Sequence, residues 1–187
     1  DSATPRYNKL GKRINAGWIT TFNEMAVISE NRITPIRKDM PFDVAALLGC
    51  AVTTGLGVVK RIANMEPGRT VVVFGVGGIG LNVVQFASLF EAEQIIAVDL
   101  SEDKLALAKQ IGATHVVNAS NGGEVEQVLK ITGGVGADYC FEAAGDVRVM
   151  QNAYAVTSAE GLVVLMGVPK LGDKLCIDPI PLYLGRR

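Results

Sequence analysis

The chain has 187 residues, enough for one domain of about 150 residues and roughly 40 more. Lys and Arg number 18 and Asp and Glu number 19, a net charge of −1, and neither sign forms a long block, which argues against nucleic acid and membrane surfaces as partners. An apolar fraction of 49% with 21 glycines indicates a folded core rather than a disordered chain. The mean hydropathy of +0.29 predicts that some apolar surface lies against something outside this chain.

The cysteines and the first residues of the chain bear on the cellular compartment of the protein. Cys50, Cys140 and Cys176 are odd in number and widely spaced, so we expect no disulfide framework, no C-x-x-C metal cluster and a reducing, cytoplasmic setting. The chain begins at Asp1 without an export signal, and we expect a fragment of something longer. Residues 70–90 carry no charge, but glycines and amides interrupt them, which indicates a strand, a turn and a helix rather than a membrane span.

The first third of the chain has weak patterns. Residues 1–20 are polar and irregular, and residues 22–36 lean towards β structure. Helical apolar spacing runs over 44–64 and is broken near Gly49 and Gly55, before a Glu-Pro-Gly turn.

From Thr70 onwards, short apolar runs alternate with helical patterns. The predicted strands are 71–74, 94–99, 115–117, 139–143 and 162–166, with a possible sixth at 175–177; the predicted helices are 78–90, 101–111, 125–129 and 147–155. This alternation is typical of parallel βαβ units with right-handed crossovers. The sequence therefore predicts an α/β fold with an open, doubly wound parallel sheet of the Rossmann type, preceded by a short β-rich segment.

A glycine-rich motif follows the first predicted strand of this region. The run Gly75-Val76-Gly77-Gly78-Ile79-Gly80 fits G-x-G-x-x-G at the mouth of a helix, where backbone N–H groups and the helix dipole hold a pyrophosphate. The first glycine permits the tight turn, the second lets phosphates approach the backbone, and the last allows close packing of helix and strand. A tight turn in an ordinary βα connection is the alternative.

An acidic residue supports the dinucleotide interpretation. Asp99 ends the second strand 19 residues after Gly80 (99 − 80 = 19), close to the spacing of about 20 expected for an acid that binds the adenosine ribose. Its carboxylate would repel a 2′-phosphate, which predicts NAD rather than NADP. The adjacent Leu100 belongs to the same candidate site. Lys104 either reaches the ribose or phosphate edge or is a solvated lysine that pairs with Glu102 or Asp103.

The loops after the fourth and fifth strands complete the candidate cofactor site. Ala143, Met166 and Val168 lie just beyond the carboxyl ends of these strands, where a doubly wound sheet lines its ligand crevice. Their small or apolar side chains suit a flat ring.

Short motifs are spread over nearly the whole chain, and they are Thr21-Phe22-Asn23-Glu24, Gly49-Cys50, Thr53-Thr54-Gly55, the loop 75–80, Ala97-Val98-Asp99, Gly112-Ala113-Thr114, Phe141-Glu142 and Gly167-Val168-Pro169. In these motifs and in their order, the chain resembles the zinc-type alcohol dehydrogenases of the medium-chain dehydrogenase/reductase superfamily. The resemblance implies the coenzyme-binding part of an enzyme that moves a hydride between NAD and a primary or secondary alcohol, or a thiol-hydroxymethyl adduct. Residues 1–40 would be the remnant of a GroES-like catalytic domain, and residues 41–187 an NAD-binding domain truncated at its C-terminus.

The resemblance also implies roles for single residues. Cys50 matches a catalytic-zinc ligand, Thr54 a catalytic residue that packs on the nicotinamide, and Met166 and Val168 backbone positions that meet the carboxamide. The segment 171–181 resembles one in which strands pair across a dimer axis, so we expect a homodimer or a higher homo-oligomer.

A catalytic zinc needs three protein ligands and an open position, and this chain offers Cys50 and one histidine, His115, whose position implies a structural role. We therefore expect the isolated chain to bind NAD without turnover.

Three alternatives remain at this point. The first is a non-catalytic NAD(H)-binding module. The second is a zinc-free member of the superfamily similar to the quinone reductases, against which Cys50 and Asp99 argue. The third is a methyltransferase, whose loop usually carries an acid before the first glycine, where this chain has Val73 and Phe74.

Overall fold

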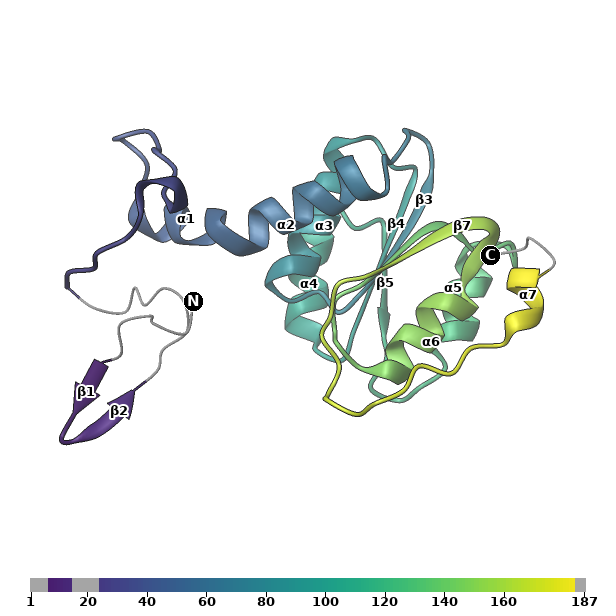
Figure 1. Ribbon diagram of the computed structural model, residues 1–187. Coiled ribbons are helices and arrows are strands. Elements are labelled where there is room, and N and C mark those ends of the chain that lie inside the picture. Colours follow the sequence, from purple (N-terminus) through teal and green to yellow (C-terminus); the bar gives the residue numbers. More distant parts are fainter. Residues whose placement is uncertain (1–6, 15–23, 184–187) are drawn as a thin grey trace. The chain divides into compact units, whose positions relative to one another are not determined.

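The computed structural model describes residues 7–14 and 24–183 and divides into two compact units, Asp1–Pro41 and Phe42–Arg187 (Figure 1). In the first unit, β1 (Tyr7–Lys9) pairs antiparallel with β2 (Lys12–Ile14). The two-residue loop between them has positive φ at both positions, 54° and 77°, the conformation that suits a tight hairpin. The expectation of irregular structure over residues 1–20 is therefore wrong for residues 7–14.

The β-leaning stretch that follows forms no strand over 24–36. Its regular element is the 3-10 helix η1 (Glu30–Arg32). Met25 is 89% and Val27 106% exposed, so no neighbouring strand or helix covers the apolar side chains that suggested β structure. Residues 21–23, which contribute to the family resemblance, lie outside the described residues.

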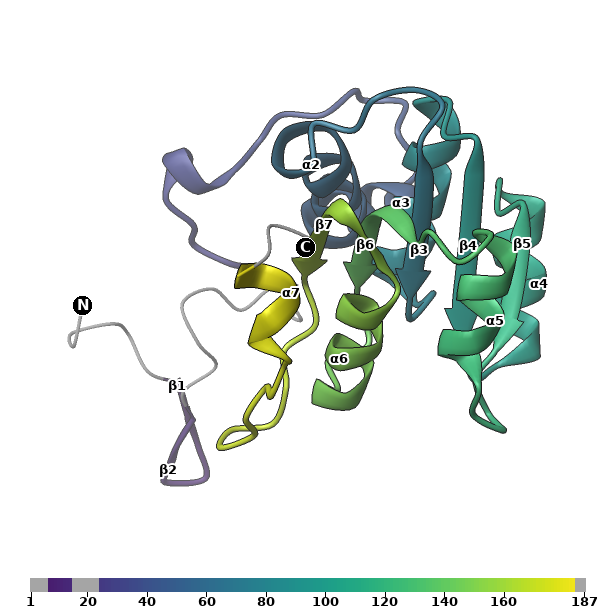
Figure 2. The ribbon, with the colours of Figure 1, turned by 90° about the vertical axis from the view of Figure 1, so that its right-hand side faces the viewer.

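The second unit is built on a parallel five-stranded sheet with the order β5-β4-β3-β6-β7 (Figure 2). Its strands are β3 (Thr70–Phe74), β4 (Gln94–Asp99), β5 (His115–Asn118), β6 (Ala137–Glu142) and β7 (Thr157–Leu165). The predicted parallel doubly wound sheet is thus confirmed, although β7 begins five residues before its predicted start, with a register irregularity against β6. The possible sixth strand at 175–177 is wrong, since that exposed segment is irregular.

Helices cover both faces of the sheet. On one face lie α3 (Gly78–Leu89) and α4 (Glu102–Gln110), which pack through residues such as Val84 and Leu105 (Figure 1). On the other face lie α5 (Glu124–Ile131) and α6 (Val147–Ala155), which pack through Val128 and Ala153. The central strand β3 needs cover on both faces of the sheet, because Val71 to Phe74 are all apolar and their side chains alternate between the two faces. All four residues are buried. The short α7 (Pro179–Tyr183) ends the described chain.

A continuous helical run leads into the sheet. It comprises α1 (Phe42–Leu47), the π-helical turn η2 (Leu48–Val52), α2 (Thr53–Gly57) and the π-helical turn η3 (Val58–Ile62). The predicted breaks at Gly49 and Gly55 are wrong. A Cβ at Gly55 would lie 2.6 Å from the Cβ of Asn82 on α3, so this glycine is a packing contact between helices. Gly49 has open space around its Cβ position.

The same run, Phe42–Ile62, is long and apolar enough to cross a membrane by length and composition. Only 11% of its most apolar window is buried, and a single helix of this kind is weak evidence for a membrane span. The uncharged stretch 70–90, by contrast, is β3, a turn and α3, as the sequence predicted.

Candidate functional site

The glycine-rich loop joins β3 to α3 at the carboxyl edge of the sheet. Gly75 has φ +83°, and its N–H donates to the Val98 carbonyl oxygen at 2.8 Å. A Cβ at Gly80 would lie 2.0 Å from the Gly75 carbonyl oxygen, so only glycine lets α3 pack this closely on the turn. A Cβ at Gly77 would meet nothing within 4 Å, which leaves this backbone open to a ligand at the helix N-terminus.

Asp99 holds the loop from the neighbouring strand. Its Oδ2 accepts a hydrogen bond from the Val76 N–H at 2.9 Å and its Oδ1 one from the Ser101 N–H at 3.0 Å. The Lys104 Nζ lies 3.7 Å from Asp99 Oδ1, so its carboxylate partner is Asp99 and not Glu102 or Asp103, which were the alternative. The side chain of Ser101 makes no capping bond to α4. Asp99 thus positions the glycine loop and draws Lys104 to the same edge.

These residues border a cavity of about 680 Å³ at the carboxyl ends of β3, β4 and β6, the position at which doubly wound sheets bind ligands. It brings together six residues of the predicted cofactor site, which are Gly75, Gly77, Asp99, Leu100, Lys104 and Ala143. Phe74 and Val98 form an apolar part of the wall. The volume is within the range of small-molecule sites.

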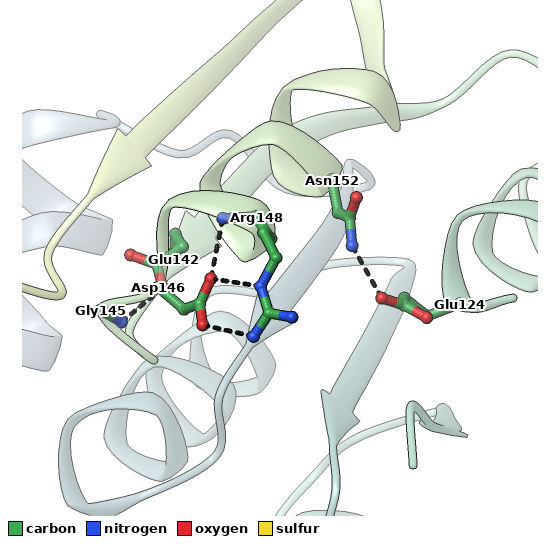
Figure 3. Close-up of polar contacts among 6 residues, drawn as sticks. All are labelled: Glu124, Glu142, Gly145, Asp146, Arg148 and Asn152. Atoms are coloured by element: carbon green, nitrogen blue, oxygen red, sulfur yellow. Dashed lines mark hydrogen bonds and ion pairs between the residues drawn. The ribbon is translucent and has the colours of Figure 1, made fainter. Parts of the chain in front are cut away.

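The far wall of the cavity contains polar residues that the sequence analysis did not identify (Figure 3). Asn152 on α6 donates through Nδ2 to the Glu124 Oε1 on α5 at 2.7 Å. Asp146 caps α6, since its Oδ1 accepts from the Arg148 N–H at 2.8 Å, and it accepts two further hydrogen bonds from the Arg148 guanidinium. The one sequence signal for this wall was an Asp before a helical pattern.

The hydrogen bonds from Arg148 change the titration of Asp146. The guanidinium, and then the backbone N–H of the same residue, lower the pKa of Asp146 to about 2. In return, the hydrogen bond to Asp146 raises the pKa of Arg148. Both groups are therefore charged at the cavity rim over the physiological pH range.

Other predicted site residues lie elsewhere. Met166 packs against the core, its N–H bonded to the Glu142 carbonyl oxygen at 2.8 Å, and Val168 is 88% exposed. Thr54 is half-buried on α2 and Cys50 is exposed in η2, and neither borders the cavity. Val76 and Gly80 are buried, so their positions support the loop rather than face the cavity.

Within the described ranges, no three His, Cys, Asp or Glu side chains come close enough together to hold a metal ion. A catalytic zinc requires three such ligands. The described residues alone therefore do not fit a zinc ion, whereas the open Gly77 backbone, the N-terminus of α3 and the Asp99 carboxylate fit a dinucleotide.

Solved structures of known proteins resemble this chain. The crystal structure of benzyl alcohol dehydrogenase from Acinetobacter calcoaceticus superposes with a TM-score of 0.76 and 33% identity, covering 80% of this chain and 41% of that one. A putative zinc-binding dehydrogenase from Sinorhizobium meliloti, solved with bound NADP, has a TM-score of 0.68 and 30% identity over 73% of this chain and 40% of that one.

Curated relatives are similar in sequence. The S-(hydroxymethyl)glutathione dehydrogenases of Paracoccus denitrificans and of Synechocystis sp. are each 39% identical to this chain, over 89% and 90% of its length, respectively. The chain spans 46% of the length of each. A family model described as zinc-binding dehydrogenase matches residues 78–187. From its sheet topology, its glycine loop and this match, the chain belongs to the zinc-binding dehydrogenase family.

Proposed function

We propose that this chain is the coenzyme-binding part of a zinc-dependent alcohol dehydrogenase that uses NAD. The observation that carries the proposal is the joint placement of the open Gly77 backbone and the Asp99 carboxylate on one cavity at the carboxyl edge of the sheet. When bound, NAD would supply the nicotinamide ring for hydride transfer between an alcohol and the corresponding aldehyde or ketone.

The residues of this chain bind and orient the dinucleotide. Backbone N–H groups at the start of α3 hold the pyrophosphate, and the absence of a side chain at Gly77 lets it approach. Asp99 hydrogen-bonds the adenosine ribose while it keeps Val76 in place. The apolar wall of Phe74, Val98 and Leu100 accommodates the adenine. The loops after β6 and β7, with Ala143, Met166 and Val168, border the nicotinamide half.

The proposal is tested by titrating the 187-residue chain with NADH and following the fluorescence of the nucleotide. We expect saturable binding that weakens about tenfold or more in Gly77→Ala, because a Cβ there enters the phosphate path. The fold of this variant should be unchanged, since Gly77 has φ −77° and open space at its Cβ position. Equal affinity of Gly77→Ala and the wild type would contradict the proposed phosphate site.

The choice of NAD over NADP is proposed from Asp99. Its carboxylate repels the 2′-phosphate of NADP, so we expect NADH to bind at least tenfold more tightly than NADPH. Asp99→Asn keeps a carbonyl oxygen for one of the two loop hydrogen bonds, and it should narrow this difference mainly by improving NADPH binding. A wild-type chain that binds NADPH as tightly as NADH would overturn the assignment.

We propose Cys50 as a zinc ligand and Thr54 as a contact of the nicotinamide in the whole protein. The further zinc ligands must then come from outside the described residues, which offer no complete set. We expect the purified 187-residue chain to hold much less than one zinc per chain by atomic emission and to oxidise alcohols at background rates. Steady turnover with added zinc would contradict this.

The proposal also covers the domains, the substrates and the assembly of the whole protein. We propose that residues 1–40 belong to its catalytic domain and residues 41–187 to its NAD-binding domain. Its substrates are proposed to be small primary or secondary alcohols, including thiol-hydroxymethyl adducts, which the names of the curated relatives support. A homodimer or higher homo-oligomer in the cytoplasm completes the proposal, and light scattering of the purified protein tests its assembly.

A non-catalytic NAD(H)-binding module is the second candidate. It requires only the dinucleotide site, which the open Gly77 backbone and the cavity beside Asp99 supply, and no metal ligands. A full-length protein that oxidises alcohols only with zinc bound would exclude it.

A further inference from the structure

Glu142 is a buried acidic residue for which the proposed function gives no role. It ends β6 and has no exposed surface. Its Oε1 accepts a hydrogen bond from the Ala144 N–H at 2.8 Å. The same oxygen accepts from the Gly145 N–H at 2.7 Å (Figure 3). Its Oε2 is also buried and has no hydrogen-bond partner in the part of the chain that the structure describes.

The Glu142 carboxylate lies beneath the crossing of two loops. The main-chain oxygen of Glu142 accepts from the N–H groups of Met166 at 2.8 Å and Gly167 at 3.0 Å, which begin the loop after β7. A Cβ at Gly167 would lie 2.1 Å from the Gly145 nitrogen and 2.7 Å from Glu142 Oε2. The loops after β6 and β7 therefore touch each other directly above this carboxylate.

A buried carboxylate is expected to have a cationic partner, because an unpaired charge inside a protein is strongly unfavourable. No Lys, Arg or His of the described residues forms an ion pair with Glu142. In a doubly wound sheet, one nucleotide half lies over each half of the sheet. If adenosine binds on the side of β4 and Asp99, the nicotinamide half would lie towards β6 and β7. That ring carries a positive charge only when it is oxidised.

We propose that Glu142 determines the preference of the site for the redox state of its nucleotide, because its buried negative charge favours the oxidised, positively charged nicotinamide over the neutral reduced one. This inference rests on the proposed function. Glu142 is fully buried and acts through the electric field in a poorly screened interior rather than by contact.

The test compares the dissociation constants of NAD⁺ and NADH for the 187-residue chain and for Glu142→Gln. Glutamine keeps a carbonyl oxygen for the Ala144 and Gly145 N–H groups and removes only the charge. We expect the ratio of the NAD⁺ constant to the NADH constant to rise about fivefold or more in this variant. NADH is followed by fluorescence, and NAD⁺ by its displacement of NADH.

Asp138 provides a control for the loss of one carboxylate from β6. It lies at the amino edge of the sheet, where its Oδ2 accepts from the Thr70 N–H at 2.8 Å and its Oδ1 lies 3.5 Å from an Arg69 guanidinium nitrogen. Asp138→Asn removes the same charge from the opposite end of β6 and should leave the ratio within about twofold. An equal change in both variants would mean that the site responds to net charge alone and would overturn the proposal.

The remaining outcomes are also decisive. A loss of affinity that is equal for NAD⁺ and NADH in Glu142→Gln would assign Glu142 a structural role only, and no change would mean that its charge does not reach the ring. If Glu142→Gln does not fold by circular dichroism, Glu142→Met, which is neutral and suited to a buried site, replaces it, and the same ratio decides. A wild-type chain that binds neither nucleotide refutes the proposed function itself, and this inference with it.

Discussion

At the scale of single residues, the glycines of the β3–α3 loop have separate structural requirements. We expect Gly80→Ala to destabilise the chain by about 2–3 kcal/mol, because its Cβ would lie 2.0 Å from a backbone oxygen that cannot move without opening the turn. Urea denaturation followed by circular dichroism measures this. In Gly78→Ala, the new Cβ meets only the Ala51 side chain at 3.8 Å, so this control should be neutral or stabilising by up to about 1 kcal/mol. Similar losses in both variants would contradict the packing role of Gly80.

The rim residue Asp146 predicts a dependence of stability on pH. The Arg148 hydrogen bonds lower its pKa from 3.8 to about 2 in the folded chain. The stabilisation is therefore present above pH 4 and is lost as the pH falls towards 2. We expect the thermal midpoint of Asp146→Asn to fall less steeply than that of the wild type over this interval. Asp173→Asn, which removes an exposed carboxylate without an ion pair among the described residues, should follow the wild-type curve.

Among single residues, the sequence predicted the roles of those that are constrained by the backbone. The roles of Gly75 in the turn and Gly80 in helix packing could be predicted from spacing, because a missing side chain at a fixed place in a βα unit has few explanations. The pairs Glu124 with Asn152 and Asp146 with Arg148 could not be. Glu124 and Asn152 are 28 residues apart and meet only because α5 and α6 cover the same face of the sheet.

At the scale of elements, the contact between α2 and α3 predicts opposite effects of two similar substitutions. Gly55→Ala should destabilise by about 1–3 kcal/mol, because its Cβ would lie 2.6 Å from the Asn82 Cβ and 3.0 Å from the Asn82 carbonyl carbon. Gly57→Ala, two residues later in the same helix, meets nothing within 4 Å and should stabilise by about 0.5–1 kcal/mol. Chemical denaturation of both variants checks this, and a gain in stability from Gly55→Ala would disprove the close contact.

The elements themselves were predicted well where burial was complete. The strands β3 and β4 and the helix α6 agree with their expected ranges, since an apolar run covered on both faces or a 3.6-residue period leaves little ambiguity. The helix over 42–62 was predicted with two breaks that it does not have. Glycine lowers intrinsic helix propensity, but packing of Gly55 against α3 outweighs that preference.

At the scale of the whole molecule, the division at Pro41 predicts that residues 42–187 fold alone. This second unit contains the whole parallel sheet and both of its helical layers. A chain of residues 42–187 should therefore keep the thermal midpoint and the NADH affinity of the 187-residue chain. A broad, non-cooperative transition in the shorter chain, measured by calorimetry, would show that residues 1–41 contribute to the fold of the second unit.

The sequence by itself determined the fold class, the order of the elements and the place of the glycine-rich turn between β3 and α3, because hydrophobic period and glycine spacing are local properties of the backbone. Tertiary structure alone decided which polar groups meet. It placed Asp99 under the Val76 N–H, joined Glu124 to Asn152 across two helices, and buried the Glu142 carboxylate below the loops after β6 and β7. Such contacts depend on the order of strands in the sheet, which brings together residues far apart in the chain and which no local pattern encodes.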